Sequence, residues 1–439
     1  MTIDALQERL DEWARELSVP GAAVGIVDGA TEHVLTTGVA SVATGAAVTG
    51  DTLFQIGSTS KTVTATAAMR LVQDGTFTLD TPVRDLLPDL RLSDPDALAA
   101  LRVRHLLTHS GGFVGDADDE ESWDDDALTR SIAGYADLPQ VFAPGAIASY
   151  SNSGLRLVGM IVAAVTGKPF EKAIAEMVFA PLGMSDSLYL PWEILNRPHV
   201  VGHVVADDGP RVAPIWGLTR QIAPEGGIGS SVRDQLRYAR FQLRGESAGA
   251  APLSDETRLL MQSPQLPASP PLDAVGLPWL LRRQGAARIV EHGGNIGNLQ
   301  LSAFALAPDQ DLAVTTLTNS VGGKELGTRV LTWALEHLRG IAPEEASPVP
   351  DAADADDVLG SYDLNQWKYH VAREGAELVI SAELSPELVE AGMPGFPIIR
   401  ARLGEDRVLR SAGRPVGRFL RLDGDREFLH LGMRAAPRI

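Results

Sequence analysis

The chain of 439 residues carries a formal net charge of −19, contains no cysteine, and has only five lysines among its 38 basic residues. The lack of cysteine excludes disulfides, thiolate metal sites and a cysteine nucleophile. The negative charge argues against nucleic acids and anionic membrane surfaces as partners, because their phosphates repel an acidic protein. With 44% hydrophobic residues and no apolar run of about 18 residues, the composition is that of a globular protein without a transmembrane helix.

The first predicted elements are a helix, a hairpin and a second helix. Apolar positions recur at helical spacing over residues 3–17, and Pro20-Gly21 ends that helix. Residues 22–27 and 33–39 are predicted to be two strands joined near Gly29-Ala30. The next helix is expected over residues 58–74, with Gly75 as its C-terminal cap. The first helix is acidic and amphipathic rather than a basic and apolar leader, which predicts a cytoplasmic protein.

The middle of the chain combines helices with long loops. The loop 116–126 holds eight carboxylates in eleven positions. We expect this loop to be solvated and mobile, with a site for a cation or a basic partner as the alternative. Further helices are expected at 157–164, 170–179, 232–243, 254–261 and 325–338, and strands at 287–291, 299–306 and 312–318.

The C-terminal part has a different composition. Residues 341–357 are rich in Pro, Ala, Asp and Glu and are predicted to be a linker between a domain over 1–340 and a second domain over 358–439. The second domain shows six short alternating runs separated by turn signals, at 369–373, 377–382, 398–403, 407–411, 418–422 and 427–431. Six or so strands in such a short segment predict a small antiparallel barrel or sandwich.

The first candidate for chemistry is Ser58-Thr59-Ser60-Lys61. Ser58 follows a glycine and begins a predicted helix, where exposed N–H groups and the helix dipole favour developing negative charge. Lys61 comes three residues later and therefore lies on the same helical face. A semi-buried lysine beside a hydroxyl can act as a base toward it.

The second candidate is Tyr150-Ser151-Asn152, in a polar loop after Pro144-Gly145. A neighbouring cation favours the phenolate form of a tyrosine, which can then take a proton from Ser58 and return it to a leaving group. Asn152 can hold Lys61 and a substrate amide in place. A structural Tyr-Asn turn is the alternative interpretation.

The third candidate is His292-Gly293-Gly294, entered from an apolar strand and followed by Asn295. Glycines permit a backbone to approach a ligand closely, so this edge can line a substrate. A similar triplet begins at His109, for which we expect a structural role because it follows the apolar Leu106-Leu107.

The ordered combination of Ser-x-x-Lys, Tyr-x-Asn and His-Gly-Gly resembles the serine β-lactamase and penicillin-binding-protein superfamily. The similarity extends over about residues 3–340 and is strongest to class C β-lactamases and their relatives: family VIII esterases, D-aminopeptidases and D-alanyl-D-alanine carboxypeptidases. It implies an α/β (α+β) fold with an antiparallel sheet flanked by helices and an all-helical subdomain. The C-terminal domain resembles the small lipocalin-like barrels appended to some members.

The resemblance also implies roles for individual residues. Ser58 is the nucleophile, Tyr150 with Lys61 the general base and then acid, and His292 a residue that orients Tyr150 or the substrate. The backbone N–H groups of Ser58 and Asn295 form the oxyanion hole. Asn152, Gly293, Gly294 and Asn295 line the substrate.

One departure from the family pattern bears on the substrate. In true class C β-lactamases the third motif is Lys-Thr-Gly, so His292 and Gly293 replace the groups that clamp a β-lactam carboxylate. We therefore expect hydrolysis of a small ester, an amide or a D-amino-acid-containing peptide through an acyl-enzyme. The alternatives are a penicillin-binding-protein-type thioesterase that cyclises a nonribosomal peptide from a carrier protein, a β-lactamase, and an inactive binding module.

We predict neither a metal nor a cofactor. The pairs His105/His109 and His199/His203 stand four residues apart, but neither has the glutamate of the metalloprotease motif. The expected partner is a small-molecule or peptide substrate, and the oligomeric state is left open.

Overall fold

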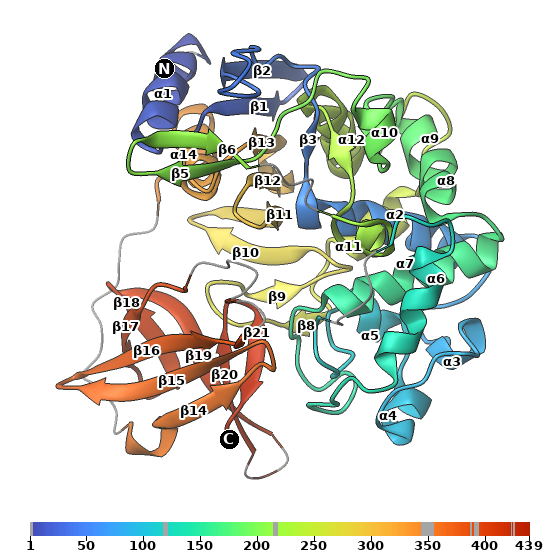
Figure 1. The fold of residues 1–439 in the computed structure, drawn as a ribbon, viewed down its shortest axis with the longest axis vertical. Coiled ribbons are helices and arrows are strands. Elements are labelled where there is room, and N and C mark those ends of the chain that lie inside the picture. Colours follow the sequence, from blue (N-terminus) through green and yellow to red (C-terminus); the bar gives the residue numbers. More distant parts are fainter. Residues whose placement is uncertain are drawn as a thin grey trace.

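The computed structural model describes residues 3–116, 122–213, 218–343, 355–386, 389, 395–422, 424 and 426–439. Two eight-stranded antiparallel sheets dominate the fold, one within residues 21–318 and one within residues 360–437 (Figure 1). Most of the proposed linker, residues 344–354, and residues 117–121 of the acidic loop lie outside the described ranges.

The first sheet has the strand order β2-β1-β13-β12-β11-β10-β9-β8. Strand β1 from the start of the chain pairs with β13, which lies almost 300 residues later. All but the last residue of β1 are buried, because β1 lies inside the sheet with helices on both faces. Its strands are β1 (Gly21–Asp28), β2 (Thr31–Gly38), β8 (Leu266–Pro267), β9 (Ala274–Val275), β10 (Leu280–Gln284), β11 (Ala287–Ile296), β12 (Gln300–Ala307) and β13 (Leu312–Thr318).

Two separate cores cover the faces of this sheet. Helices α1 (Ile3–Glu16) and α14 (Gly323–Arg339) pack on one face through residues such as Leu10 and Val330. Helices α2 (Ser60–Gln73) and α12 (Val232–Arg244) pack on the other face. These elements confirm the predicted arrangement of an antiparallel sheet flanked by helices.

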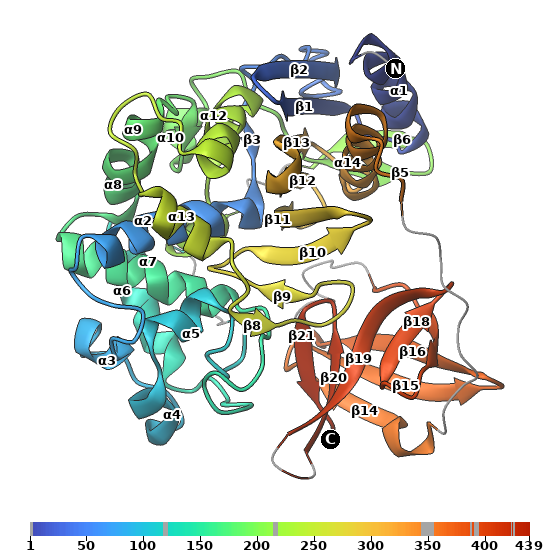
Figure 2. The same cartoon turned by 180° about the vertical axis from the view of Figure 1, so that it is seen from behind.

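The remaining helices gather beside α2, on the side of the molecule where Figures 1 and 2 both show α3 to α10. They are α3 (Val83–Leu86), α4 (Pro95–Ala100), α5 (Val103–Leu107), α6 (Ala127–Arg130), α7 (Asn152–Thr166), α8 (Phe170–Ile174), α9 (Ala180–Leu182), α10 (Pro191–Ile194), α11 (Ala223–Gly226) and α13 (Asp255–Met261). Short strands β3 (Phe54–Gln55), β4 (Ser187–Leu188) and β7 (Gly229–Ser230) form a small sheet, and β5 (His203–Ala206) pairs with β6 (Gly209–Val212). No helix in the described ranges is long and apolar enough to cross a bilayer.

Helix α2 is almost entirely buried, and its sequence explains how this is tolerated. Alanine and threonine are small enough for close packing, and the threonine hydroxyls bond to backbone carbonyls, as Thr66 does to Thr62 at 2.9 Å. Gly75 follows the helix with a φ of +75°, as its predicted role as a cap requires.

The second sheet is a nearly closed antiparallel barrel in which the strands follow one another in chain order. Closure comes from a bridge between Tyr362 and Arg438 and from a hydrogen bond of Ile439 N to the Ser361 carbonyl at 2.9 Å. Its strands are β14 (Gly360–Asp363), β15 (Trp367–Glu374), β16 (Glu377–Leu384), β17 (Ile399–Leu403), β18 (Val408–Ser411), β19 (Arg414–Leu422), β20 (Arg426–Leu431) and β21 (Arg434–Pro437).

The barrel thus contains two strands that the sequence did not predict. Both β14 and β21 are only four residues long and contain Gly, Asp or Pro, which are rare in strands. The barrel core includes Tyr362, Phe419 and Leu429.

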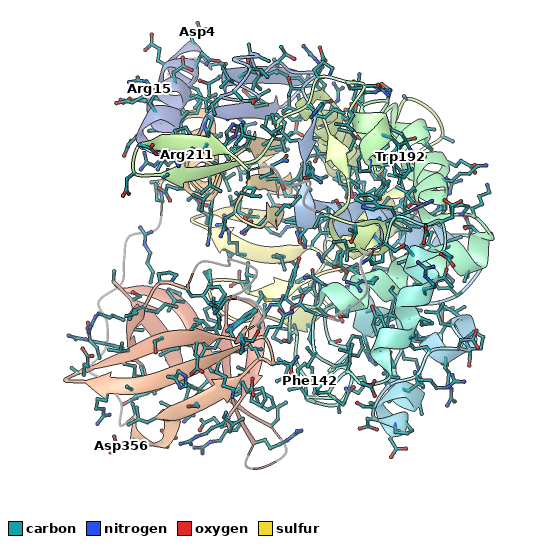
Figure 3. All side chains as sticks on the ribbon, viewed as in Figure 1. Asp4, Arg15, Phe142, Trp192, Arg211 and Asp356 are labelled. Carbon is teal, nitrogen blue, oxygen red and sulfur yellow. The ribbon has the colours of Figure 1, made fainter. Side chains whose placement is uncertain are left out.

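The barrel packs against the rest of the chain through β20 and β21, which lie beside β8 and β9 in both ribbon views (Figures 1 and 2). Met433 joins an apolar cluster with Ala268 and Val275. Phe142, labelled in Figure 3 where the helical part meets the barrel, stacks edge-on against Phe428 with 6.3 Å between ring centroids. The segment just before Tyr150 is therefore in direct contact with the barrel.

Candidate active site

Ser58 and Lys61 form a hydrogen-bonded pair at the start of α2. Ser58 is half-buried in a 3₁₀ turn (Gly57–Thr59) that leads into the helix. The Lys61 ammonium donates to Ser58 Oγ at 2.9 Å and to the carbonyl oxygen of Glu225 at 2.6 Å. The lysine is completely buried, so its proton donors are directed at these two oxygens and away from bulk water.

Asn295 lies beside the turn that carries Ser58. A Cβ placed on Gly57 would stand 3.0 Å from the backbone nitrogen of Asn295, and Gly57 itself has a φ of +52°. On β11, a Cβ on Gly294 would stand 1.9 Å from the Ile56 carbonyl. Both glycines therefore let β11 approach the serine turn closely, which places the Asn295 backbone nitrogen beside that turn.

Tyr150 is surrounded by two imidazoles and two cations. Its ring stacks on His109 at 4.6 Å between centroids, with 27° between the planes, and lies 6.0 Å from the ring of His292. The Lys61 Nζ is 5.1 Å and the Arg434 Cζ 5.7 Å from the Tyr150 centroid. Two cationic groups therefore contact the Tyr150 ring.

His292 lies within β11, whereas the sequence suggested that the strand ended just before it. Its Nδ1 is 2.9 Å from the carbonyl oxygen of Gly293. Burial, together with the nearby Lys61 charge, lowers the pKa of His292 to about 3. The ring is therefore neutral at physiological pH and adds no charge to the site.

His109 is also buried and neutral. Its Nδ1 accepts a hydrogen bond from the Ser151 backbone N–H at 3.1 Å. Burial, together with the nearby Lys61 charge, holds the pKa of His109 well below its usual range. The expected structural residue thus lies against the Tyr150 ring, where it supports that ring.

Asn152 is held by an acidic residue and not by Lys61. Its amide donates to Asp116 Oδ1 at 2.6 Å, and the other oxygen of Asp116 pairs with Arg434 from β21. Burial raises the pKa of the Asp116 carboxyl, but the Arg434 charge and the two hydrogen bonds outweigh it, so that this pKa is lowered. Among the described residues no hydrogen bond joins Asn152 to Lys61, which differs from the expected contact.

Where the acidic loop is described, Asp124 and Asp125 are exposed, as expected of a solvated loop, whereas Asp116 is largely buried. Besides Asp116, Asp125 pairs with Arg220 and Asp124 pairs with Arg130 at 3.1 Å. These carboxylates are engaged by arginines of this chain.

Two further groups at the site have no signal in a sequence motif. Glu225 contributes a backbone carbonyl to Lys61, while its carboxylate forms a buried ion pair with Arg156 of α7 at 3.1 and 3.2 Å. Arg434 comes from β21, a strand that the sequence did not predict. Every residue type has a backbone carbonyl, so the sequence gives no sign of which carbonyl binds Lys61. Arg434 is far from Tyr150 in the sequence, so no motif spacing predicts their contact.

A serine hydroxyl bonded to a buried lysine, next to a tyrosine between cations and a strand N–H, defines a site for acyl transfer to serine. The family model for Beta-lactamase matches residues 3–338, and the chain belongs to this family. Its members of known activity include serine hydrolases, and this chain is a serine hydrolase of the β-lactamase and penicillin-binding-protein type.

Individual relatives agree with this assignment. The chain is 31% identical over 368 residues to Penicillin-binding protein 4 of Amycolatopsis lactamdurans, covering 81% of this chain and 96% of that protein. The crystal structure of SurE superposes with a TM-score of 0.78 at 28% identity, over 99% of this chain and 98% of the other, and SurE with D-Leu does so at 0.76. A D-amino acid amidase from Ochrobactrum anthropi SV3 superposes at 0.62 with 27% identity, over 75% of this chain and 97% of that chain.

Proposed function

We propose that this hydrolase forms an acyl-enzyme on Ser58 and cleaves amide bonds of D-amino-acid-containing peptides, with small esters as further substrates. The observation that carries the proposal is the 2.9 Å hydrogen bond between Lys61 Nζ and Ser58 Oγ in a buried setting. Because Lys61 is also tied to the Glu225 carbonyl, the pair is held in position before substrate binds.

In the proposed reaction Ser58 Oγ attacks the carbonyl carbon and its proton passes to Tyr150, while the Lys61 ammonium stays hydrogen-bonded to Ser58 Oγ. The developing oxyanion accepts hydrogen bonds from the backbone N–H groups of Ser58 and Asn295. The carbon–nitrogen bond then breaks, its electron pair goes to nitrogen, and Tyr150 returns the proton to that nitrogen. Water repeats the sequence to release the acid. A cytoplasmic location remains a prediction.

The neutral His292 argues against efficient hydrolysis of β-lactams. A ring with a pKa of about 3 carries no positive charge at pH 7, so this position offers no cation to a β-lactam carboxylate. Gly293 offers no side-chain hydroxyl either.

The D-configuration is supported by the ligand of one similar structure and by the name of another, although the second was solved with L-phenylalanine amide as well as with D-phenylalanine. SurE was solved with D-Leu, and the enzyme of Ochrobactrum anthropi is named a D-amino acid amidase. The test compares D-phenylalanine amide with its L-enantiomer, with Ser58→Ala as the control. We expect kcat/KM to be at least tenfold higher for the D-amide than for the L-amide. The Ser58→Ala variant should show no hydrolysis above background. Equal rates for the enantiomers would contradict the proposed substrate class.

A second function is supported by the way the barrel takes part in the site. Arg434 reaches Tyr150 from the barrel, and SurE matches the chain over both of its parts. We infer that a peptidyl thioester is the alternative acyl donor, with an internal amine replacing water and closing a ring. Mass spectrometry of the products of a peptidyl thioester distinguishes the two: a cyclic peptide supports the second function and a linear acid the first.

A further inference from the structure

A cavity of about 370 Å³ lies between the barrel and the segments that flank Tyr150. One wall comes from residues 113–115 and 139–142, and the opposite wall from residues 363–365 and from β20, β21 and the C-terminus. Tyr150 and Ser149 also line it. The volume is within the range of pockets that hold a small ligand.

Tyr150 connects this cavity to the nucleophile. Tyr150 lines the cavity, and the centre of its ring is 5.1 Å from Lys61 Nζ, which donates a hydrogen bond to Ser58. In the proposed reaction Tyr150 returns the proton to the leaving nitrogen, so that nitrogen must lie next to its hydroxyl. The part of the substrate beyond the nitrogen is thereby brought to the mouth of the cavity.

The lining indicates what the cavity prefers. Apolar side chains dominate its walls, among them Phe113, Val141, Phe142 and Leu364. Its charged residues are two arginines, Arg426 and Arg434, against one acid, Asp363. An apolar side chain gains from burial here, whereas a cationic side chain meets like charge.

We propose that this cavity is the subsite for the amine-side residue of the substrate and that it selects a bulky apolar residue over a small or basic one. The inference rests on the proposed acyl-enzyme at Ser58. The same site holds the leaving amine during acylation and, by microscopic reversibility, any amine that attacks the acyl-enzyme in place of water. In that reverse step the amine nitrogen bonds to the carbonyl carbon, the Ser58 Oγ–carbon bond breaks, and the amine proton passes through Tyr150 to Ser58 Oγ.

The test uses D-phenylalanine methyl ester as the acyl donor for the full chain and measures how amines compete with water for the acyl-enzyme. Glycinamide, leucinamide and lysinamide are added at equal concentrations, and the dipeptide amides and free acid are quantified by mass spectrometry. We expect leucinamide to be captured about tenfold more often than glycinamide, and lysinamide least.

Two variants place the preference in the cavity. Val141→Trp fills it and Leu364→Asp adds a negative charge to its barrel side, and neither residue belongs to the proposed catalytic groups. Both should bring the leucinamide to glycinamide ratio near one. Leu259→Asp, at an exposed position of α13 that is half accessible, is the matched control and should keep the wild-type ratio.

The outcomes distinguish failure of the proposed subsite from failure of the proposed function. Ester turnover that depends on Ser58, combined with equal capture of the three amines or capture of none, overturns the subsite and leaves the proposed function standing. A wild-type ratio in both cavity variants also overturns it. No turnover of the ester by Ser58 overturns the proposed function and the subsite together.

Discussion

The guanidinium of Arg434, on the last strand of the barrel, lies over the ring of Tyr150 with 5.7 Å between Cζ and the ring centroid. The same guanidinium lies 5.3 Å from the ring of Trp367 and pairs with Asp116, which accepts a hydrogen bond from Asn152. Arg434 thus contacts Tyr150, the proposed general base, directly. It is linked to Asn152 through the carboxylate of Asp116. The barrel is part of the site and does more than cover it.

Replacing Arg434 by methionine should reduce acylation on the order of 100-fold, because a buried carboxylate loses its charge partner and Tyr150 loses a cation. The measurement is the rate of acylation by a D-phenylalanine ester under single-turnover conditions. Arg421→Met is the matched control, since Arg421 is a barrel arginine paired with Asp357 at the surface. A loss in Arg434→Met no greater than in the control would contradict the role of Arg434.

The buried ion pair between Arg156 and Glu225 should stabilise both the fold and the position of Lys61. Arg156→Met leaves the Glu225 carboxylate buried without its charge partner, and we expect the free energy of unfolding to fall by about 3 kcal/mol. The Arg156→Met/Glu225→Leu double variant removes both charges and should recover most of this loss. Urea denaturation measures both; equal stability of Arg156→Met and the wild type would refute the prediction.

Replacing Gly57 should reduce activity, and this effect can be distinguished from the effect of backbone strain on stability. Gly57 and Gly297 have nearly the same φ, +52° and +54°, but a Cβ on Gly57 meets Asn295 N whereas a Cβ on Gly297 meets nothing within 4 Å. Alanine at either position should cost about 1 kcal/mol of stability from the left-handed conformation. Only Gly57→Ala should also lower kcat, by tenfold or more, because it displaces the oxyanion N–H. Similar kcat values for the two variants would show that Asn295 N plays no such part.

Acid should destabilise the protein through its buried neutral histidines. Burial lowers the pKa to about 3 for His292 and to about 4 for His430, and it holds that of His109 well below its usual range. The unfolded chain, with histidine pKa values near 6.5, binds more protons below that pH than the folded chain does. The histidine contribution is therefore fully present above pH 6.5 and is lost progressively as the pH falls toward about 3.

The expected slope follows from the number of such groups. Each contributes at most about 1.4 kcal/mol per pH unit, so three give up to about 4 kcal/mol per unit between pH 6 and 5. Denaturation by urea across this range measures the slope, and NMR of the imidazole nitrogens should show these three rings neutral at pH 5.5. Titration of His292 near pH 6 would exclude the neutral ring on which the argument against β-lactams depends.

Local patterns predicted much of this structure. Ser58 and Lys61 are one helical turn apart, so their contact follows from helix geometry alone. The strands β1, β2, β12 and β13 have continuous or alternating apolar sequences, and their predicted bounds lie within two residues of those observed. The barrel was predicted from the six of its strands that carry alternating residues.

The remainder depends on contacts that sequence spacing does not encode. The strand Arg434–Pro437 has too few residues to show alternation and ends in proline, yet barrel closure makes it a strand and brings Arg434 to Tyr150. Asn152 meets Asp116 and not Lys61 because Arg434 fixes the Asp116 carboxylate from another part of the chain. Tertiary packing, not local preference, decides these positions.

The most direct test of the account is the identity of the residue that becomes acylated. The full chain is treated with a fluorophosphonate probe, and the labelled peptide is identified by mass spectrometry. We predict a single adduct on Ser58, its loss in Ser58→Ala, and its retention in Ser60→Ala, whose serine lies two residues away and accepts a hydrogen bond from the Ile228 N–H. Labelling of another residue, or undiminished labelling of Ser58→Ala, would contradict the account.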